Sequence, residues 1–179
     1  MIARLTGPTS FAPRVALFYV AVFSVVGIYL PFFPLWLETR ALTPTQIGIV
    51  LAVPMAVRAL ITPFMVTMGD RAGDRRAITV RYATAAFVLL ALLFLASGFW
   101  QILAVVVFVA VFWDALIPLG DAIALSGVRK FGMDYGQVRL WGSVAFIAAN
   151  IVAGALVSAL SGSVVLPVLF VAYGCVVVS

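Results

Sequence analysis

The chain has 179 residues, of which 65% are hydrophobic and 9% are charged, and its formal net charge is +5. Soluble domains average about 25% charged residues, so this composition indicates a protein embedded in a membrane. Histidine is absent and there is one cysteine, which excludes histidine-based catalysis, histidine-containing metal sites and disulfides within the chain. We therefore expect an integral membrane protein with neither a metal nor a cofactor.

Uncharged runs predict six membrane-spanning helices, each close to the roughly 20 residues that cross the hydrocarbon core. They follow a tail at residues 1–13 and form one all-α bundle over residues 14–179. Two runs are too long for one crossing, and we divide them at "SGFW" (97–100) and "SGS" (161–163). The expected spans are 15–37, 46–68, 78–97, 100–122, 138–160 and 163–179. No basic flank follows the sixth, so we expect a chain truncated in that span.

The basic side chains fall almost entirely on one side of this predicted topology. Cytoplasmic segments of membrane proteins carry an excess of Lys and Arg. With the N-terminus in the cytoplasm, only Arg40 lies outside, and the cytoplasmic side receives Arg4, Arg14, Arg71, Arg75, Arg76, Arg81, Arg129, Lys130 and Arg139. The positive charge thus indicates membrane topology and no nucleic-acid partner. We expect a multi-pass protein of the inner membrane, in contact with the lipid bilayer.

Four ionisable residues lie within spans or near their ends, where charge is costly and commonly functional. Arg58 and Asp114 are near mid-depth, whereas Asp121 and Arg139 are nearer the cytoplasmic edge. Asp114 and Asp121 are seven residues apart, with Pro118 between them, which predicts one shared face of a helix. Two roles stay open for Asp114: a structural pair with Arg58, or a carrier of protons.

The fifth span carries its polar residues along a single face. Arg139, Ser143, Phe146 and Asn150 follow the i, i+4, i+7, i+11 spacing of one helical stripe. We expect this stripe to face water or a ligand. Small residues suited to close helix packing occupy the opposite surface: Ala145, Ala149 and Ala153.

Three stretches resemble the major facilitator superfamily of transporters. Residues 27–55, "GIYLPFFPLWLETRALTPTQIGIVLAVPM", resemble spans one and two of the lactose permease branch. The loop "GDRAGDRR" (69–76) resembles the motif between spans two and three, although Val66 and Asp74 depart from it. "DYGQVRLWGSVAFI" (134–147) is similar to span five of 3-phenylpropionate, nucleoside and oligosaccharide proton symporters. The resemblance implies the N-terminal half of a two-half transporter, with a C-terminal six-span half as partner.

The resemblance also implies a substrate-binding set. Asp121 and Arg139 match an acid and an arginine that grip the substrate in this family, and a salt bridge that orders two helix ends is the alternative. The full expected set is Asp121, Arg139, Ser143, Asn150, Asp114 and Arg58.

Two further groups are candidates for gating and conformational change. Pro31, Pro34 and Trp36 lie at the outer end of span one, where interrupted helices can shape a transport cavity. An ordinary interfacial aromatic belt is the alternative for Trp36. The loop residues are expected to lock the two halves together, and they are Asp70, Arg71, Gly73, Arg75 and Arg76. A solvated loop that sets the topology is the alternative for Arg75 and Arg76.

The expected activity is proton-coupled symport of a small organic solute by alternating access, with an aromatic carboxylate such as 3-phenylpropionate favoured. A sugar or nucleoside symporter and a drug or metabolite exporter remain open, as do a dimerising half-transporter and a fragment that does not transport. An enzyme is not expected, because the chain lacks histidine and its one lysine, Lys130, lies in a predicted loop.

Overall fold

The computed structural model describes residues 8–71 and 73–179, and within these ranges it contains helices and turns without a β-strand. Within these ranges seven α-helices, three of 26–32 residues and four of 14–17 residues, are joined by turns and two short 3-10 segments, Leu92–Phe94 and Gly162–Val164. The α-helices are α1 (Pro8–Thr39), α2 (Pro44–Arg71), α3 (Arg75–Ala91), α4 (Phe99–Trp113), α5 (Leu116–Phe131), α6 (Tyr135–Leu160) and α7 (Val165–Val178). The all-α fold class is confirmed.

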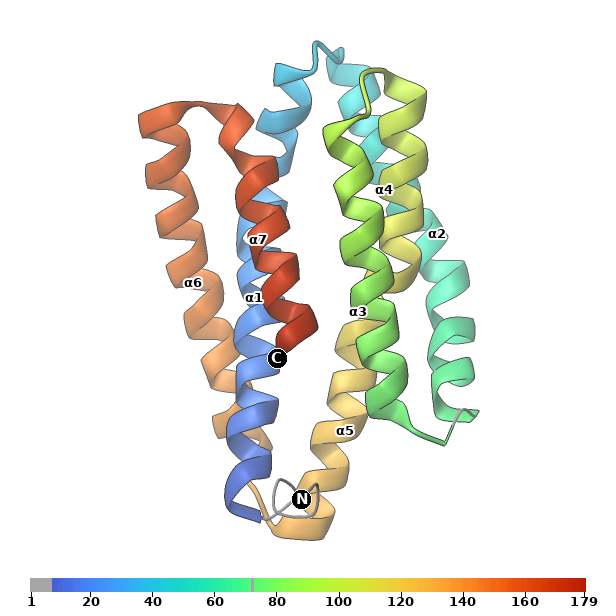
Figure 1. The fold of residues 1–179 in the computed structure, drawn as a ribbon, viewed down its shortest axis with the longest axis vertical. Helices are drawn as coiled ribbons and strands as arrows, with labels where there is room; N and C mark the ends of the chain where they lie inside the picture. The colour runs from blue at the N-terminus through green and yellow to red at the C-terminus, as the bar shows by residue number, and fades with distance from the viewer. Residues whose placement is uncertain (1–7, 72) are drawn as a thin grey trace.

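The helices stand along the long axis of the molecule in one bundle (Figure 1). Helix α1 packs against α6 and α7, whereas α4 packs against α2 and α3. Contacts of α7 with α3, and of α5 with both α1 and α3, join these two groups. We call the end that holds the α2–α3 and α5–α6 connections the basic end, because Arg71, Arg76, Arg129 and Lys130 lie there.

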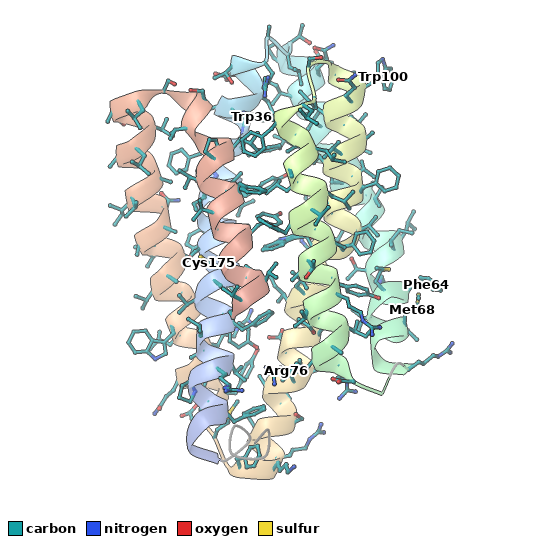
Figure 2. The ribbon with its side chains drawn as sticks, viewed as in Figure 1. Trp36, Phe64, Met68, Arg76, Trp100 and Cys175 are labelled. Atoms are coloured by element: carbon teal, nitrogen blue, oxygen red, sulfur yellow. The ribbon has the colours of Figure 1, made fainter. Side chains whose placement is uncertain are left out.

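The described helices are suited to a lipid environment. Five segments are long and apolar enough to cross a membrane: Phe11–Thr39, Pro44–Gly69, Arg75–Phe94, Phe99–Phe131 and Tyr135–Leu160. A shorter apolar helical segment, Gly162–Val178, accompanies them. Large apolar side chains cover the outside, and Figure 2 shows Phe64 and Met68 on the outer side of α2. This arrangement is that of a multi-pass membrane protein.

The fourth predicted span lies within one apolar segment of the structure, Phe99–Phe131, which contains a local helix irregularity. The sequence predicts a single crossing at 100–122, but α4 ends at Trp113 and α5 begins at Leu116. Pro118 accounts for the break, because it has no backbone N–H to donate to the carbonyl of Asp114 one turn earlier. Helix α5 then continues to Phe131, past the predicted end of the span. Asp114 therefore sits at a helix discontinuity.

The prolines of the first span do not end its helix. Helix α1 continues through Pro31 and Pro34 to Thr39. On its inner side the rings of Tyr29 and Phe33 stack with centroids 4.6 Å apart, and those of Phe33 and Trp36 stack at 5.4 Å. Trp36 is only 2% exposed, so it belongs to the core, in contrast with the 76% exposed Trp100 at the same end (Figure 2).

The loop between α2 and α3 is shaped by two neighbouring residues. Gly73 has φ = 75°, in the left-handed region that glycine enters at little cost. Asp74 then caps α3, and its carboxylate accepts a hydrogen bond from the backbone N–H of Ala77 at 3.0 Å. Helix capping thus explains the acid that departs from the loop motif. The side chain of Asp70 lies outside the described part of the structure.

Helices α1 and α6 approach each other closely at Gly27. A Cβ built on Gly27 would lie 2.5 Å from the backbone oxygen of Phe146, closer than real side chains come. On α6, Ala145 and Ala153 are both buried, at 9% and 3% exposure. Small residues on both helices therefore allow their backbones to pack closely.

Replacing Gly27 with alanine should push α1 and α6 apart. We expect Gly27→Ala to destabilise the protein by about 1–3 kcal/mol, as overpacking in a well-packed core does. The measurement is thermal unfolding of the purified protein in detergent. Gly48→Ala is the matched control, because a Cβ there meets nothing within 4 Å and alanine favours a helix. Equal stability of the Gly27 and Gly48 variants would contradict the described packing.

Candidate functional site

A charged cluster joins three helices near the basic end of the bundle. Arg139 on α6 donates from Nη1 to Oδ1 of Asp121 on α5 at 2.9 Å. The hydroxyl of Tyr19 on α1 donates to the same oxygen at 2.6 Å, and that of Tyr135 does so at 3.0 Å. One carboxylate oxygen therefore accepts three hydrogen bonds. The Arg139 and Asp121 side chains remain 35% and 31% exposed.

Aromatic rings surround the guanidinium of this pair. The Cζ atom of Arg139 lies 5.2 Å from the ring centre of Phe23, 5.4 Å from that of Tyr19 and 6.0 Å from that of Tyr135. Such contacts attract a cation to the face of the ring, most strongly where water is excluded. We call these five residues the Arg139 cluster: Tyr19, Phe23, Asp121, Tyr135 and Arg139.

The local sequence places two members of the cluster one turn apart. Asp134 caps α6 by accepting a hydrogen bond from the backbone N–H of Gln137 at 3.1 Å. The helix therefore begins at Tyr135, and Arg139 lies four residues later on the same face. On α1, Tyr19 and Phe23 have the same four-residue spacing, and their ring centres lie 6.3 Å apart.

A second, looser ion pair lies at the break between α4 and α5. Nη1 of Arg58 on α2 is 3.9 Å from Oδ1 of Asp114, which exceeds the usual N–H···O hydrogen-bond range of about 2.7–3.2 Å. The Arg58 side chain is 61% exposed and that of Asp114 is 17% exposed. The structure therefore brings together the two residues of the expected structural pair. A proton-carrying role for Asp114 stays a prediction.

A cavity of about 440 Å³ opens beside this second pair. Its walls come from α1, α2, α3, α4, α5 and α7, with Leu93 of a 3-10 segment and Asp114 between α4 and α5. The rings of Trp113 and Tyr173 form one part of the wall, with centroids 4.3 Å apart. Tyr29, Phe33, Arg58 and Asp114 also line it. We call this space the Arg58 cavity.

The structure divides the predicted substrate-binding set. Asp121 and Arg139 lie in one pair, whereas Asp114 and Arg58 lie in the other. Ser143 is exposed and Asn150 is half-buried on α6, and no hydrogen bond within the described residues joins either to the Arg139 cluster. Their stripe is not the only exposed face of α6, because Trp141, Val144, Ile147 and Ile151 are exposed as well.

The predicted gating residues occupy the two ends of the bundle. Trp36 lies at the end opposite to Arg76 (Figure 2). Pro31 is exposed and Pro34 is half-buried near Trp36. Arg71, Gly73 and Arg76 are exposed at the basic end, and Arg75 is half-buried there. The structure keeps both groups apart from the two ion pairs.

Sequence reasoning missed the tyrosines. Tyr19 and Tyr135 bind Asp121 directly, and Tyr29 and Tyr173 line the Arg58 cavity. The sequence held a signal for Tyr19, Tyr29 and Tyr173, which lie within predicted spans. A tyrosine in an apolar span has a hydroxyl that normally needs a polar partner. No spacing rule, however, connects Tyr19 with an acid 102 residues later.

Comparison with known proteins identifies relatives of the whole described bundle. Residues 13–179 match the MFS_1 like family. The chain is 36% identical over 160 residues to the "Probable 3-phenylpropionic acid transporter" of Escherichia coli (strain K12), covering 86% of the chain and 41% of that protein. It is 32% identical over 143 residues to the "Maltose permease" of Geobacillus stearothermophilus, covering 77% of the chain and 35% of that protein. The chain thus spans about two fifths or less of these relatives, and no solved structure matches it.

A double-mutant cycle should detect the coupling between Asp121 and Arg139. We expect Asp121→Asn and Arg139→Gln each to destabilise the protein, and the double variant to lose less than the sum. The coupling should be about 1 kcal/mol, since both side chains are about one-third exposed. Thermal unfolding in detergent measures it. Glu38→Gln with Arg129→Gln, two exposed residues on different helices, is the control cycle and should show no coupling. Additivity in both cycles would refute the interaction.

Proposed function

Because the chain belongs to the MFS_1 like family of the major facilitator superfamily, we propose that it forms the N-terminal half of a proton-coupled symporter for a small organic solute. Its curated relatives are named as transporters of a carboxylic acid and of a sugar. Transporters of this kind move solute by rocking one helical bundle against another around a central site. A second bundle is therefore the proposed partner of this one.

The observation that carries the proposal is a partly exposed ion pair within an apolar helix bundle. A guanidinium has five N–H donors, and Arg139 uses one of them in its hydrogen bond to Asp121. Among the described residues no other hydrogen bond from this guanidinium is formed, nor one to Oδ2 of Asp121. A solute can therefore reach free donors and a free acceptor at a site that is costly to keep charged.

We favour an aromatic carboxylate as the solute. A carboxylate accepts two hydrogen bonds from the planar fork of an arginine, and aromatic walls such as Tyr19 and Phe23 suit an aromatic ring. The relative with the higher identity is named for 3-phenylpropionic acid.

A sugar is the second candidate. The free oxygen of Asp121 and the donors of Arg139 suit hydroxyl groups, and the other relative is named as a maltose permease. The same pair would serve only as a structural link between α5 and α6 if no solute reached it.

The charges support an orientation in the membrane. The basic end carries Arg71, Arg76, Arg129 and Lys130, and basic residues favour the cytoplasmic side. We place this end in the cytoplasm and the protein in the inner membrane. Arg40 would then lie outside, where its guanidinium packs 5.0 Å from the Trp36 ring centre and donates to the carbonyl of Leu93 at 3.5 Å.

Uptake of labelled 3-phenylpropionate tests the proposed function. The native gene product, at its natural length, is reconstituted in liposomes with an inward proton gradient. We expect accumulation that collapses with a protonophore, and a loss of about tenfold or more in the Arg139→Gln variant because its fork of donors is removed. Arg129→Gln, an exposed arginine at the same end, should transport normally.

Competition identifies the solute class in the same assay. Excess unlabelled maltose should leave 3-phenylpropionate uptake unchanged. Proton-driven maltose uptake without uptake of the acid would favour the sugar. Normal uptake by Arg139→Gln would reduce the ion pair to a structural role.

A further inference from the structure

We propose that the Arg58 cavity binds the aromatic carboxylate of the proposed function, and that the ligand carboxylate replaces Asp114 as the partner of Arg58. This inference rests on the proposed function and adds a binding position at Asp114, seven residues along the chain from Asp121 of the Arg139 cluster. It also assigns different tasks to the two ion pairs.

The two pairs differ in how firmly they are held. Arg139 makes a hydrogen bond of 2.9 Å to a carboxylate oxygen that also accepts from two tyrosines. Arg58 stands 3.9 Å from Asp114, and within the described residues neither of these side chains makes a hydrogen bond. All five donors of Arg58 are thus available, on a side chain that is 61% exposed at the cavity edge. The Arg58 pair is the one that a ligand can displace.

The walls of the cavity fit an aromatic acid of small size. Its volume of about 440 Å³ falls within the range of about 300–1,000 Å³ typical of small-molecule sites. Aromatic rings of Tyr29, Phe33, Trp113 and Tyr173 line it, so a phenyl group would find stacking surfaces. Arg58 supplies the positive charge that a carboxylate needs.

Two tyrosine hydroxyls of the cavity wall are further candidate donors to a ligand. Tyr173 is only 4% exposed, lines the Arg58 cavity, and makes no hydrogen bond within the described residues. Among the described residues no fully buried side-chain oxygen lacks a hydrogen-bond partner, so the Tyr173 hydroxyl keeps some accessible surface at the cavity. The hydroxyl of Tyr29 likewise has no described partner at the same cavity. A bound carboxylate would accept hydrogen bonds from such groups.

The helix break beside the Arg58 cavity also supports a binding site there. Irregular backbone at membrane depth is tolerated where it is buried in protein or lines a cavity. Helix α4 ends at Trp113, and Trp113, Asp114 and Ile117 all line the Arg58 cavity. Discontinuous helices commonly build the binding sites of transporters.

Replacing Asp114 by the ligand carboxylate as the partner of Arg58 leaves the Asp114 charge without a partner, and this links ligand binding to proton uptake. When the ligand takes Arg58, Asp114 loses the only cation described beside it. The other titratable groups that line the cavity are Tyr29 from α1 and Tyr173 from α7, which supply no positive charge. A proton taken from water onto the Asp114 carboxylate restores neutrality. One ligand carboxylate and one proton therefore enter together.

Binding and proton uptake can be measured on the same sample. The native gene product in detergent is titrated with 3-phenylpropionate, by calorimetry for affinity and with a pH-indicator dye in weak buffer for protons. The neutral alcohol of the same carbon skeleton is the control ligand. We expect about one proton taken up per carboxylate bound and none with the alcohol.

Variants assign the two effects to their residues. Arg58→Gln should weaken binding of the carboxylate about tenfold or more and leave that of the alcohol unchanged. Arg58→Lys keeps the charge and should bind with intermediate affinity. Asp114→Asn should still bind the carboxylate, but without proton uptake. Arg129→Gln should match the unaltered protein in both measurements.

Several outcomes would overturn the inference. Unchanged affinity in Arg58→Gln, with binding lost only in Arg139→Gln, would confine the ligand to the Arg139 cluster. If Arg58→Gln fails to fold, equal proton uptake with the carboxylate and the alcohol would still refute the exchange. Transport of 3-phenylpropionate with normal kinetics in Arg58→Gln would refute this inference alone, whereas no binding of the acid by the unaltered protein would also remove the aromatic carboxylate from the proposed function.

Discussion

The hydrocarbon core of a membrane offers no water to a charged side chain, so each charge within a span needs a partner from the protein. Arg139 meets this constraint through Asp121 and three aromatic rings, while two tyrosine hydroxyls donate to the Asp121 carboxylate. Tyr19 joins α1 to α5 through its hydrogen bond to Asp121, and its ring packs against Arg139 of α6. The cluster thus fixes three helices relative to one another while leaving donors free at a partly exposed edge.

The Arg58–Asp114 pair partners its charges less completely than the Arg139–Asp121 pair does. The proposed exchange of a ligand and a proton depends on this difference. Arg58 and Asp114 are close enough to attract each other but too far apart to form a good hydrogen bond. Their cavity has aromatic walls and two tyrosine hydroxyls that make no described hydrogen bond. The firmly held pair links helices and keeps free donors for a solute, whereas the loosely held pair can exchange its partner for a ligand and a proton. Both are found in one half of the proposed transporter.

Sequence patterns predicted the features that depend on neighbouring residues. Composition and uncharged runs indicated a helical membrane bundle, and the small residues Ala145 and Ala153 are indeed buried on α6. The break after Trp113 was not predicted, because the apolar run continues across it and hides the effect of Pro118. The tyrosine contacts of Asp121 were not predicted either, since they depend on how α1, α5 and α6 pack in three dimensions.

The unequal strength of the two ion pairs is the central claim, and nuclear magnetic resonance of arginine side chains tests it most directly. The native gene product would carry nitrogen-15 arginine, with the two signals assigned through Arg58→Lys and Arg139→Lys. We predict slow hydrogen exchange and hindered rotation for the Arg139 guanidinium, fast averaging for that of Arg58, and a shift of the Arg58 signals on addition of 3-phenylpropionate. Equal protection of both guanidinium groups, or a ligand-induced shift confined to Arg139, would contradict the account.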